Sequence, residues 1–149
     1  MNKEIAECVG LWLAEGDKKT TAEVTFTNNC IELIIFFHET IKALYKGKNK
    51  PRIYVYSPTD RILILKLQGF VIRNYVDKRA NRTYYIYRLA DTEFVKEWEK
   101  IVNSIKNDTS YYSDILRGIF AGEGYVKHDL KNNNSRNVTI SAGLRDLFI

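Results

Sequence analysis

Residues 8–16, CVGLWLAEG, carry a pattern that returns downstream as LRGIFAGEG in residues 116–124. Each copy is an apolar stretch with two small residues four positions apart, followed by a glutamate and a glycine. Residues four apart stack on one face of an α-helix, so each predicted helix has one smooth strip. The two strips consist of Gly10 with Ala14 and of Gly118 with Gly122. Two such strips can pack backbone against backbone.

A glutamate closes each predicted helix, at a position where negative charge is unfavourable. The C-terminal end of a helix carries partial negative charge, which disfavours a carboxylate there by roughly 0.3–1 kcal/mol. The glycine that follows is a common helix stop. If the strips pack together, Glu15 and Glu123 converge with two helix ends of the same sign. Only a cation makes this arrangement favourable, and oxygen ligation without histidine favours a hard ion such as Mg²⁺.

Both stretches resemble the motif of the LAGLIDADG homing endonucleases, which are DNA-cutting enzymes associated with introns and inteins. The layout agrees well, although Trp12 and Phe120 occupy variable apolar positions and glutamate replaces the commoner aspartate. In that family the paired motif helices form the interface between two α/β halves, and the last acid of each motif binds catalytic metal.

The resemblance implies specific roles for the motif residues. Glu15 and Glu123 would be the catalytic, metal-binding acids, and the main-chain carbonyls of Ala14 and Gly122 would add ligands to Mg²⁺. A lysine near the pocket usually assists in this family, but no lysine of this chain matches such a position. The recurrence of the motif a domain's length downstream is itself an indication of duplicated architecture.

The resemblance also implies an α+β fold in which each half has the order αββαββα and an antiparallel sheet shaped as a saddle. We expect a first lobe in residues 1–108. Residues 109–149 would begin a second lobe that stops after its motif helix and first strands. The last residues, 147–149, would leave an exposed apolar end, so we expect either self-association or a missing C-terminal half.

Composition agrees with an intracellular, cytoplasmic protein. The chain has 149 residues, of which 45% are hydrophobic and 13% aromatic, enough to build a core. No apolar run approaches the roughly 20 residues of a membrane span, and the first residues do not begin a signal peptide. Cys8 and Cys30 are too few for a disulfide framework and are expected to be buried thiols. His38 and His128 lack further ligands at suitable spacing, which argues against zinc.

Hydrophobic periodicity predicts the elements of the first lobe. Helices are expected at Glu4–Ala14, at Cys30–Tyr45 and from Asp91 or Thr92 to Asn103. Strands are expected at Ala22–Thr27 and Arg52–Tyr56, and residues 71–77 and 83–89 are expected to form a hairpin with a basic tip. Residues 61–68 fit a buried strand or a short helix equally well. In the second lobe, Val138–Ser141 repeats the first strand, and an apolar helical pattern begins at Leu144.

A net charge of +5 and a pI near 9.1 favour a polyanionic partner, and double-stranded DNA is the expected one. Basic residues and tyrosines fall together on the predicted strands and their connections. The predicted DNA-binding residues are Lys18, Lys19, Arg52, Tyr54, Tyr56, Arg73, Lys78, Arg79, Arg82, Arg88, Lys127 and Arg136. Tyrosines also suit any half-buried pleated surface, which would account for about half of those on the strands.

The sequence therefore predicts a magnesium-dependent, site-specific DNA endonuclease. Two alternatives remain open at this stage. One is a DNA-binding regulator or a maturase-like RNA splicing cofactor that uses the same scaffold without cutting. The other is an inactive remnant of an intron or intein protein.

Overall fold

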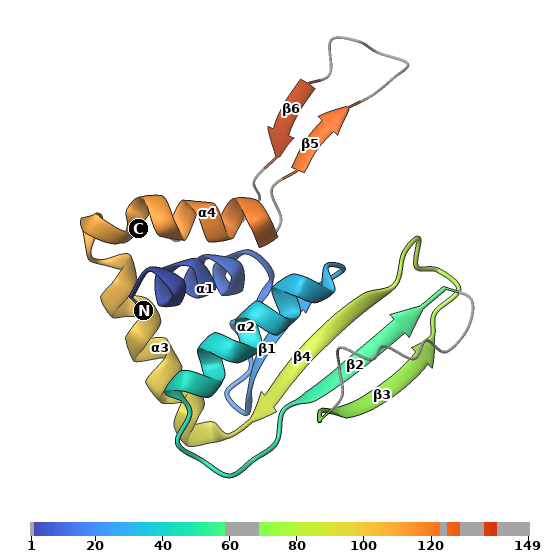
Figure 1. Ribbon diagram of the computed structural model, residues 1–149, viewed down its shortest axis with the longest axis horizontal. Coiled ribbons are helices and arrows are strands. Elements are labelled where there is room, and N and C mark those ends of the chain that lie inside the picture. The colour runs from blue at the N-terminus through green and yellow to red at the C-terminus, as the bar shows by residue number, and fades with distance from the viewer. Residues whose placement is uncertain (1, 59–68, 123–124, 129–135, 140–149) are drawn as a thin grey trace. The chain divides into compact units, whose positions relative to one another are not determined.

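The computed structural model describes residues 2–58, 69–122, 125–128 and 136–139, the last two ranges as backbone (Figure 1). Within these residues the fold is α+β, with four α-helices and a four-stranded mixed sheet. The elements are α1 (Asn2–Glu15), β1 (Glu23–Asn28), α2 (Ile31–Leu44), β2 (Arg52–Ser57), β3 (Val71–Val76), β4 (Tyr84–Ala90), α3 (Thr92–Lys106), the 3-10 turn η2 (Thr109–Tyr111), α4 (Tyr112–Gly122), β5 (Tyr125–His128) and β6 (Arg136–Thr139).

The chain divides into two compact units. One unit combines residues 1–15 with residues 101–149, and the other consists of residues 16–100. These two units are groups of residues that lie close together in space. The expected lobes, 1–108 and 109–149, were defined by the repeated sequence motif, and they stay a prediction. The expected strand that ends at Ser141, the apolar pattern from Leu144 onwards and the undecided segment 61–68 fall partly or wholly outside the described residues.

The four-stranded sheet of the unit formed by residues 16–100 has the order β1-β4-β2-β3. β4 is antiparallel to both β1 and β2, but β2 and β3 are parallel, so the expectation of a wholly antiparallel sheet is wrong. Neighbouring parallel strands need a long crossover connection, usually of a dozen or more residues. The chain between Ser57 and Val71 is long enough to be one.

The hairpin expected in residues 71–89 is also wrong, because β2 lies between β3 and β4. Burial gives the physical reason. Ile53 and Val55 of β2 are almost completely buried and suit a central strand, whereas Val71, Tyr75 and Val76 of β3 are exposed and suit the sheet edge. Adjacent strands in the sequence pair often but not always.

A single strand connects α1 and α2, where the αββαββα order requires two. Residues 16–22 form turns, because side chains capture their backbone groups locally. The Lys19 N–H donates to Asp17 Oδ1 at 2.9 Å, and the Ala22 N–H donates to Thr20 Oγ1 at 3.2 Å. Such local hydrogen bonds compete with a sheet ladder for the same backbone groups. The segment is tied to β1 by the Asp17 N–H, which donates to Thr25 Oγ1 at 3.0 Å.

One face of the sheet forms the apolar core of this unit and is covered by α2 (Figure 1). The ring of Phe37 in α2 stacks on Phe26 of β1 with centroids 4.7 Å apart. The same ring meets Tyr87 and Trp98 edge-on, at 5.4 and 6.1 Å. Each large apolar side chain buried in this way stabilises the fold by roughly 1.5–3 kcal/mol. Because strand side chains alternate, the opposite face of the sheet is left to polar residues.

The helix α3 begins at a side-chain cap. The sequence left Asp91 and Thr92 open as caps, and the structure selects Asp91, whose Oδ1 accepts the Phe94 N–H at 3.1 Å. Its Oδ2 accepts the Tyr45 hydroxyl at 2.6 Å. The expected end at Asn103 is wrong by one turn, because the apolar period continues through half-buried Ile105.

Two further expectations can be compared with the described residues. Cys8 and Cys30 are both free thiols; Cys8 is buried as expected, and Cys30 is only half-buried. Among the described residues, no helix combines the length and apolar character needed to cross a membrane.

The contacts of Asp91 make the stability of this unit depend on pH. The Tyr45 hydroxyl and the Phe94 N–H lower the pKa of Asp91 below its ordinary value of 3.8. A carboxyl with a lowered pKa in the folded state stabilises it above the unfolded pKa, and this is lost as the pH falls through the folded pKa. Asp91→Asn keeps a capping side chain but removes the charge. We expect it to lower the melting temperature at pH 7, with the difference from the parent chain narrowing below pH 3.8.

Thermal melts followed by circular dichroism across this pH range measure the effect. Glu97→Gln, at an exposed position of α3, removes the same charge away from the cap. If the difference in melting temperature between Asp91→Asn and the parent chain stays constant from neutral to acid pH, the charge of Asp91 does not stabilise the fold.

Candidate functional site

The motif helices α1 and α4, both in the unit formed by residues 1–15 and 101–149, pack backbone against backbone. A methyl group on Gly10 would lie 2.9 Å from the Cα of Gly118 and would overlap the carbonyl oxygen of Ile115. A methyl group on Gly118 would overlap the carbonyl oxygen of Glu7. Only glycine fits at these two positions, which explains the small strip in each motif.

The two helices run parallel, so their C-terminal ends lie together. Near their middle, Gly118 faces the carbonyl of Glu7 and the Cα of Gly10. Further along, a Cβ on Gly122 would lie 3.0 Å from the Cβ of Ala14. The contacts therefore advance in the same direction along both helices, which lie side by side in Figure 1. All four residues of the two strips are brought together.

The paired helix ends form an acidic position. α1 ends at Glu15, which is half-buried, and α4 ends at Gly122 in contact with Ala14. The C-terminal end of a helix carries partial negative charge, and two such ends lie together here. Glu123 lies outside the described residues, so the pairing of Glu15 with Glu123 stays a prediction. Within the described part of the chain, no three histidine, cysteine, aspartate or glutamate side chains gather closely enough to hold a metal.

An ion-pair network beside the strips adds a contact that the sequence analysis missed. Arg117 Nη1 of α4 donates to Glu7 Oε1 of α1 at 2.7 Å and to Asp114 Oδ1 at 3.2 Å. Glu7 is the main cause that raises the pKa of the Arg117 guanidinium. The spacing of Asp114 and Arg117 on one helix face could have indicated half of the network. The contact with Glu7 follows only from the helix pairing.

The second group of candidate residues lies on the polar face of the sheet, within the unit of residues 16–100. Strand registers align these side chains, because residues that pair across strands point to the same side. The polar residues of this face, called the polar face below, are Glu23, Thr25 and Thr27 of β1, Arg52, Tyr54 and Tyr56 of β2, Arg73 and Tyr75 of β3, and Tyr84 and Arg88 of β4; the apolar residues Val71, Ile86 and Ala90 lie on the same side. Five of the predicted DNA-binding residues thus share one surface.

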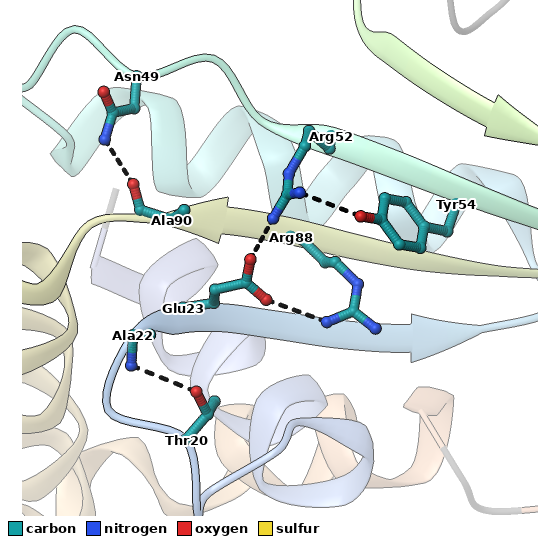
Figure 2. A network of polar contacts seen from close by, with 8 residues as sticks. All are labelled: Thr20, Ala22, Glu23, Asn49, Arg52, Tyr54, Arg88 and Ala90. Carbon is teal, nitrogen blue, oxygen red and sulfur yellow. Dashed lines mark hydrogen bonds and ion pairs between the residues drawn. The ribbon is translucent and has the colours of Figure 1, made fainter.

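A carboxylate joins two of the arginines on the polar face (Figure 2). Glu23 Oε1 accepts from Arg52 Nη2, and Glu23 Oε2 accepts from Arg88 Nη1 at 3.0 Å. Arg52 Nη1 also donates to the hydroxyl of Tyr54 at 3.0 Å, and the Arg88 guanidinium lies 4.7 Å from the centre of the Tyr54 ring. The sequence analysis assigned no role to Glu23.

The tyrosines of the polar face form a stack. The ring of Tyr56 lies between Tyr75 and Tyr84, with centroids 5.0 and 4.9 Å away and interplanar angles of 20° and 5°. Both faces of the Tyr56 ring are therefore occupied. By contrast, Tyr85 and Tyr87 are buried on the apolar face and belong to the core. Burial raises the pKa of the Tyr85 hydroxyl. Tyr85 and Tyr87 thus fill the core, whereas a role of the stacked tyrosines in DNA binding stays a prediction.

The remaining predicted DNA-binding residues lie on connections or on the strand pair β5 and β6. Lys18 and Lys19 are exposed on the turn segment before β1. Lys78, Arg79 and Arg82 are exposed between β3 and β4, and Arg79 Nε lies 3.4 Å from Asp77 Oδ1. Lys127 and Arg136 lie on β5 and β6, which pair with each other and whose side chains are outside the description.

A cavity of about 510 Å³ on the apolar side of the sheet was not expected from the sequence. It is bordered by α2, by the connection that leads to β2 and by β4. His38 lies at its wall, with Nδ1 3.1 Å from the Tyr87 hydroxyl and its ring edge-on to Phe70 at 4.5 Å. Burial lowers the pKa of His38. The sequence pattern predicted a helix in this region but gave no sign of a cavity beside it.

Known proteins provide no independent identification. Comparisons of the chain with protein-family models, with curated proteins and with solved structures found no match.

The backbone contact at Gly10 and Gly118 predicts that alanine at either position lowers the stability of the fold, the opposite of its usual effect in a helix. Replacing a glycine inside a helix by alanine normally stabilises the fold by roughly 0.5–1 kcal/mol. Gly10→Ala and Gly118→Ala are instead expected to destabilise it by about 1–3 kcal/mol, because the added methyl group meets backbone of the other helix. Urea unfolding of each variant measures the change.

Gly122→Ala is the matched comparison at the same interface. Its methyl group would meet a side-chain methyl group at 3.0 Å rather than backbone, so a smaller loss is expected. If Gly118→Ala were as stable as the parent chain, the backbone contact between α1 and α4 would be refuted.

Proposed function

We propose that this chain is a site-specific, double-stranded DNA endonuclease of the LAGLIDADG type. The observation that carries the proposal is the parallel pairing of two helices with repeated motifs, in which each motif places an acid directly after the contact. Ala14 touches Gly122, so two oxygen-rich helix ends share one location. A pattern chosen only for packing would need the small residues but not the two glutamates.

The donor chemistry of this location suits a hard divalent cation. Glu15 and Glu123 would hold Mg²⁺ together with the main-chain carbonyls of Ala14 and Gly122, and all of these ligands are oxygens. The partial negative charge of both helix ends adds to the attraction. When bound, the cation supplies Lewis-acid stabilisation of the charge that develops on the phosphate.

The proposed reaction is hydrolysis of a phosphodiester bond. A water oxygen attacks phosphorus, the bond from phosphorus to the 3′ oxygen breaks, and the leaving 3′ oxygen takes up a proton from solvent water, so that the products are a 5′ phosphate and a 3′ hydroxyl. The carboxylate of Glu15, at the end of a helix fixed by backbone contact, would orient the attacking water and accept its proton. Fixed orientation of reacting groups is a major source of rate enhancement.

The polar face of the sheet would bind the duplex. It presents Arg52, Arg73 and Arg88 together with the tyrosine stack. Proteins that bind single strands commonly stack bases on open aromatic faces. Tyr56 offers no open face, because Tyr75 and Tyr84 cover both sides of its ring. This arrangement favours a duplex, whose bases stay stacked on each other.

A second candidate function is DNA or RNA binding without cutting, as in a regulator or a maturase-like splicing cofactor. The observation in its favour is that the polar face belongs to the unit of residues 16–100, which contains three aligned arginines and neither motif acid. The acids Glu15 and Glu123 would then have no chemical role. The two candidate functions therefore predict different effects of replacing these acids: cleavage is lost in the first, and nothing changes in the second.

Glu15→Gln and Glu123→Gln are each expected to lower Mg²⁺-dependent cleavage of DNA by at least a hundredfold. The reason is that each substitution removes one of the charged metal ligands while it keeps the shape of the side chain. Binding to the same DNA, measured by mobility shift, should stay close to that of the parent chain. The assay incubates supercoiled plasmid with protein in Mg²⁺ and, in parallel, in EDTA.

Glu97→Gln, at an exposed position of α3, is the control for loss of one negative charge. Nicking or linearisation by the parent chain that EDTA abolishes supports the endonuclease. A mobility shift without cutting supports the second candidate. Cleavage by either motif variant at the parental rate would refute the assignment of the acids.

A further inference from the structure

Glu23 lies at the centre of the charged part of the polar face. Its side chain is 17% exposed, less than the side chains of Arg52 at 31% and Arg88 at 28%. Each carboxylate oxygen is engaged by a different arginine (Figure 2). Arg52 and Arg88 are register partners on adjacent strands. Like charges directly opposite each other destabilise a sheet, and Glu23 offsets this repulsion.

The register explains how one carboxylate reaches both arginines. Glu23 on β1 pairs with Ala90 on β4, and Arg88 lies two positions earlier on the same face of β4. Arg52 belongs to β2, on the far side of β4, so its side chain has to cross β4. The methyl group of Ala90 leaves that path open. A larger residue at this position would separate Arg52 from Glu23.

Tyr54 fixes both guanidinium groups from a second direction. Its hydroxyl accepts from Arg52 Nη1 at 3.0 Å, and its ring centre lies 5.5 Å from Arg52 Cζ and 4.7 Å from Arg88 Cζ. Each arginine is thus held by a carboxylate and by an aromatic ring. Contacts of this kind fix the orientation of the guanidinium plane as well as the position of its charge.

We infer that Glu23 is a positioning residue that makes Arg52 and Arg88 specificity-determining residues, with their guanidinium groups directed at guanine edges rather than at phosphates. This inference rests on the proposed binding of duplex DNA. A phosphate contact depends mainly on charge, which Glu23 offsets. A guanine contact depends on two parallel N–H donors aimed at O6 and N7, which an oriented guanidinium provides.

The spacing of the two arginines fits neighbouring base pairs. Directly opposite residues on antiparallel strands have Cα atoms about 4.5–5.5 Å apart. Successive base pairs rise by about 3.4 Å. β2 and β4 are the central strands of the sheet, so their long arginine side chains, rather than the strands themselves, would reach into the major groove, where guanine presents both acceptors. Arg52 and Arg88 would therefore contact adjacent or next-adjacent base pairs.

The test selects binding sequences from duplexes with a randomised central stretch, using the full chain without Mg²⁺ so that no DNA is cut. Arg52→Lys and Arg88→Lys keep the charge but lose the two-pronged donor. Each is expected to lose on the order of tenfold preference for guanine at one position. The dependence of affinity on salt should not change, because the number of phosphate contacts is the same.

Glu23→Gln is expected to weaken the guanine preference at both positions and to raise the affinity for unselected duplex. Lys96→Arg and Glu97→Gln, both at exposed positions of α3, are the matched controls and should leave the preference intact. Circular dichroism establishes whether each variant is folded. If Glu23→Gln does not fold, the two arginine variants decide the outcome.

The outcomes separate this inference from the proposed function. If the parent chain binds no duplex at all, the proposed function fails, and the inference fails with it. If the parent chain selects a sequence and both arginine variants select the same one with equal strength, the inference fails while duplex binding stands. If the parent chain binds every duplex equally, the assignment of Arg52 and Arg88 to bases is overturned.

Discussion

The backbone contact between Gly10 and Gly118 is the constraint on which the motif helices depend. These residues lie far apart in the sequence, yet each would clash with the opposite helix if it carried even a methyl group. Backbone atoms cannot rotate away as side chains can, so the contact fixes the register of α1 against α4 tightly. That register brings Ala14 to Gly122 and therefore brings together two helix ends of the same partial charge. The packing of the two helices therefore places like partial charges next to each other, and the negative charge of Glu15 adds to their repulsion.

The sheet is subject to a different constraint, because one of its faces belongs to the apolar core and the other carries charged side chains. Alternation along the strands sends Phe26, Val55 and Tyr87 to the apolar face and leaves the arginines and the tyrosine stack opposite them. Two arginines in direct register are unfavourable in isolation. Glu23 makes the pair tolerable, and in doing so it turns two mobile cations into oriented hydrogen-bond donors. Stability and recognition therefore depend on the same carboxylate.

Local sequence patterns predicted most elements but not their partners. Helical and strand periods placed β1, α2, β2, β3 and β4 to within about a residue at each end, because these periods reflect which side chains need burial. The order of the strands was not predicted correctly. β2 lies between β3 and β4, because Ile53 and Val55 need the burial that a central strand provides. The glycine strips were found because their spacing is a property of one helix. The link from Glu23 to Arg52 could not be found, because it spans three strands and depends on a register that no single strand encodes.

The two candidate sites have opposite charge, and this difference bears on how one chain could both hold and cut DNA. The polar face has three arginines, Arg52, Arg73 and Arg88, against one carboxylate, so its net positive charge favours the approach of a polyanion whichever groups its arginines finally contact. The paired helix ends offer carbonyls and Glu15, so without a cation they repel phosphates. Binding by the polar face should therefore need no divalent ion, whereas close approach of a phosphate to the helix ends should require one. In the function we propose, the sheet would therefore hold DNA without metal, and hydrolysis would begin only when metal and phosphate are both present at the end of α1.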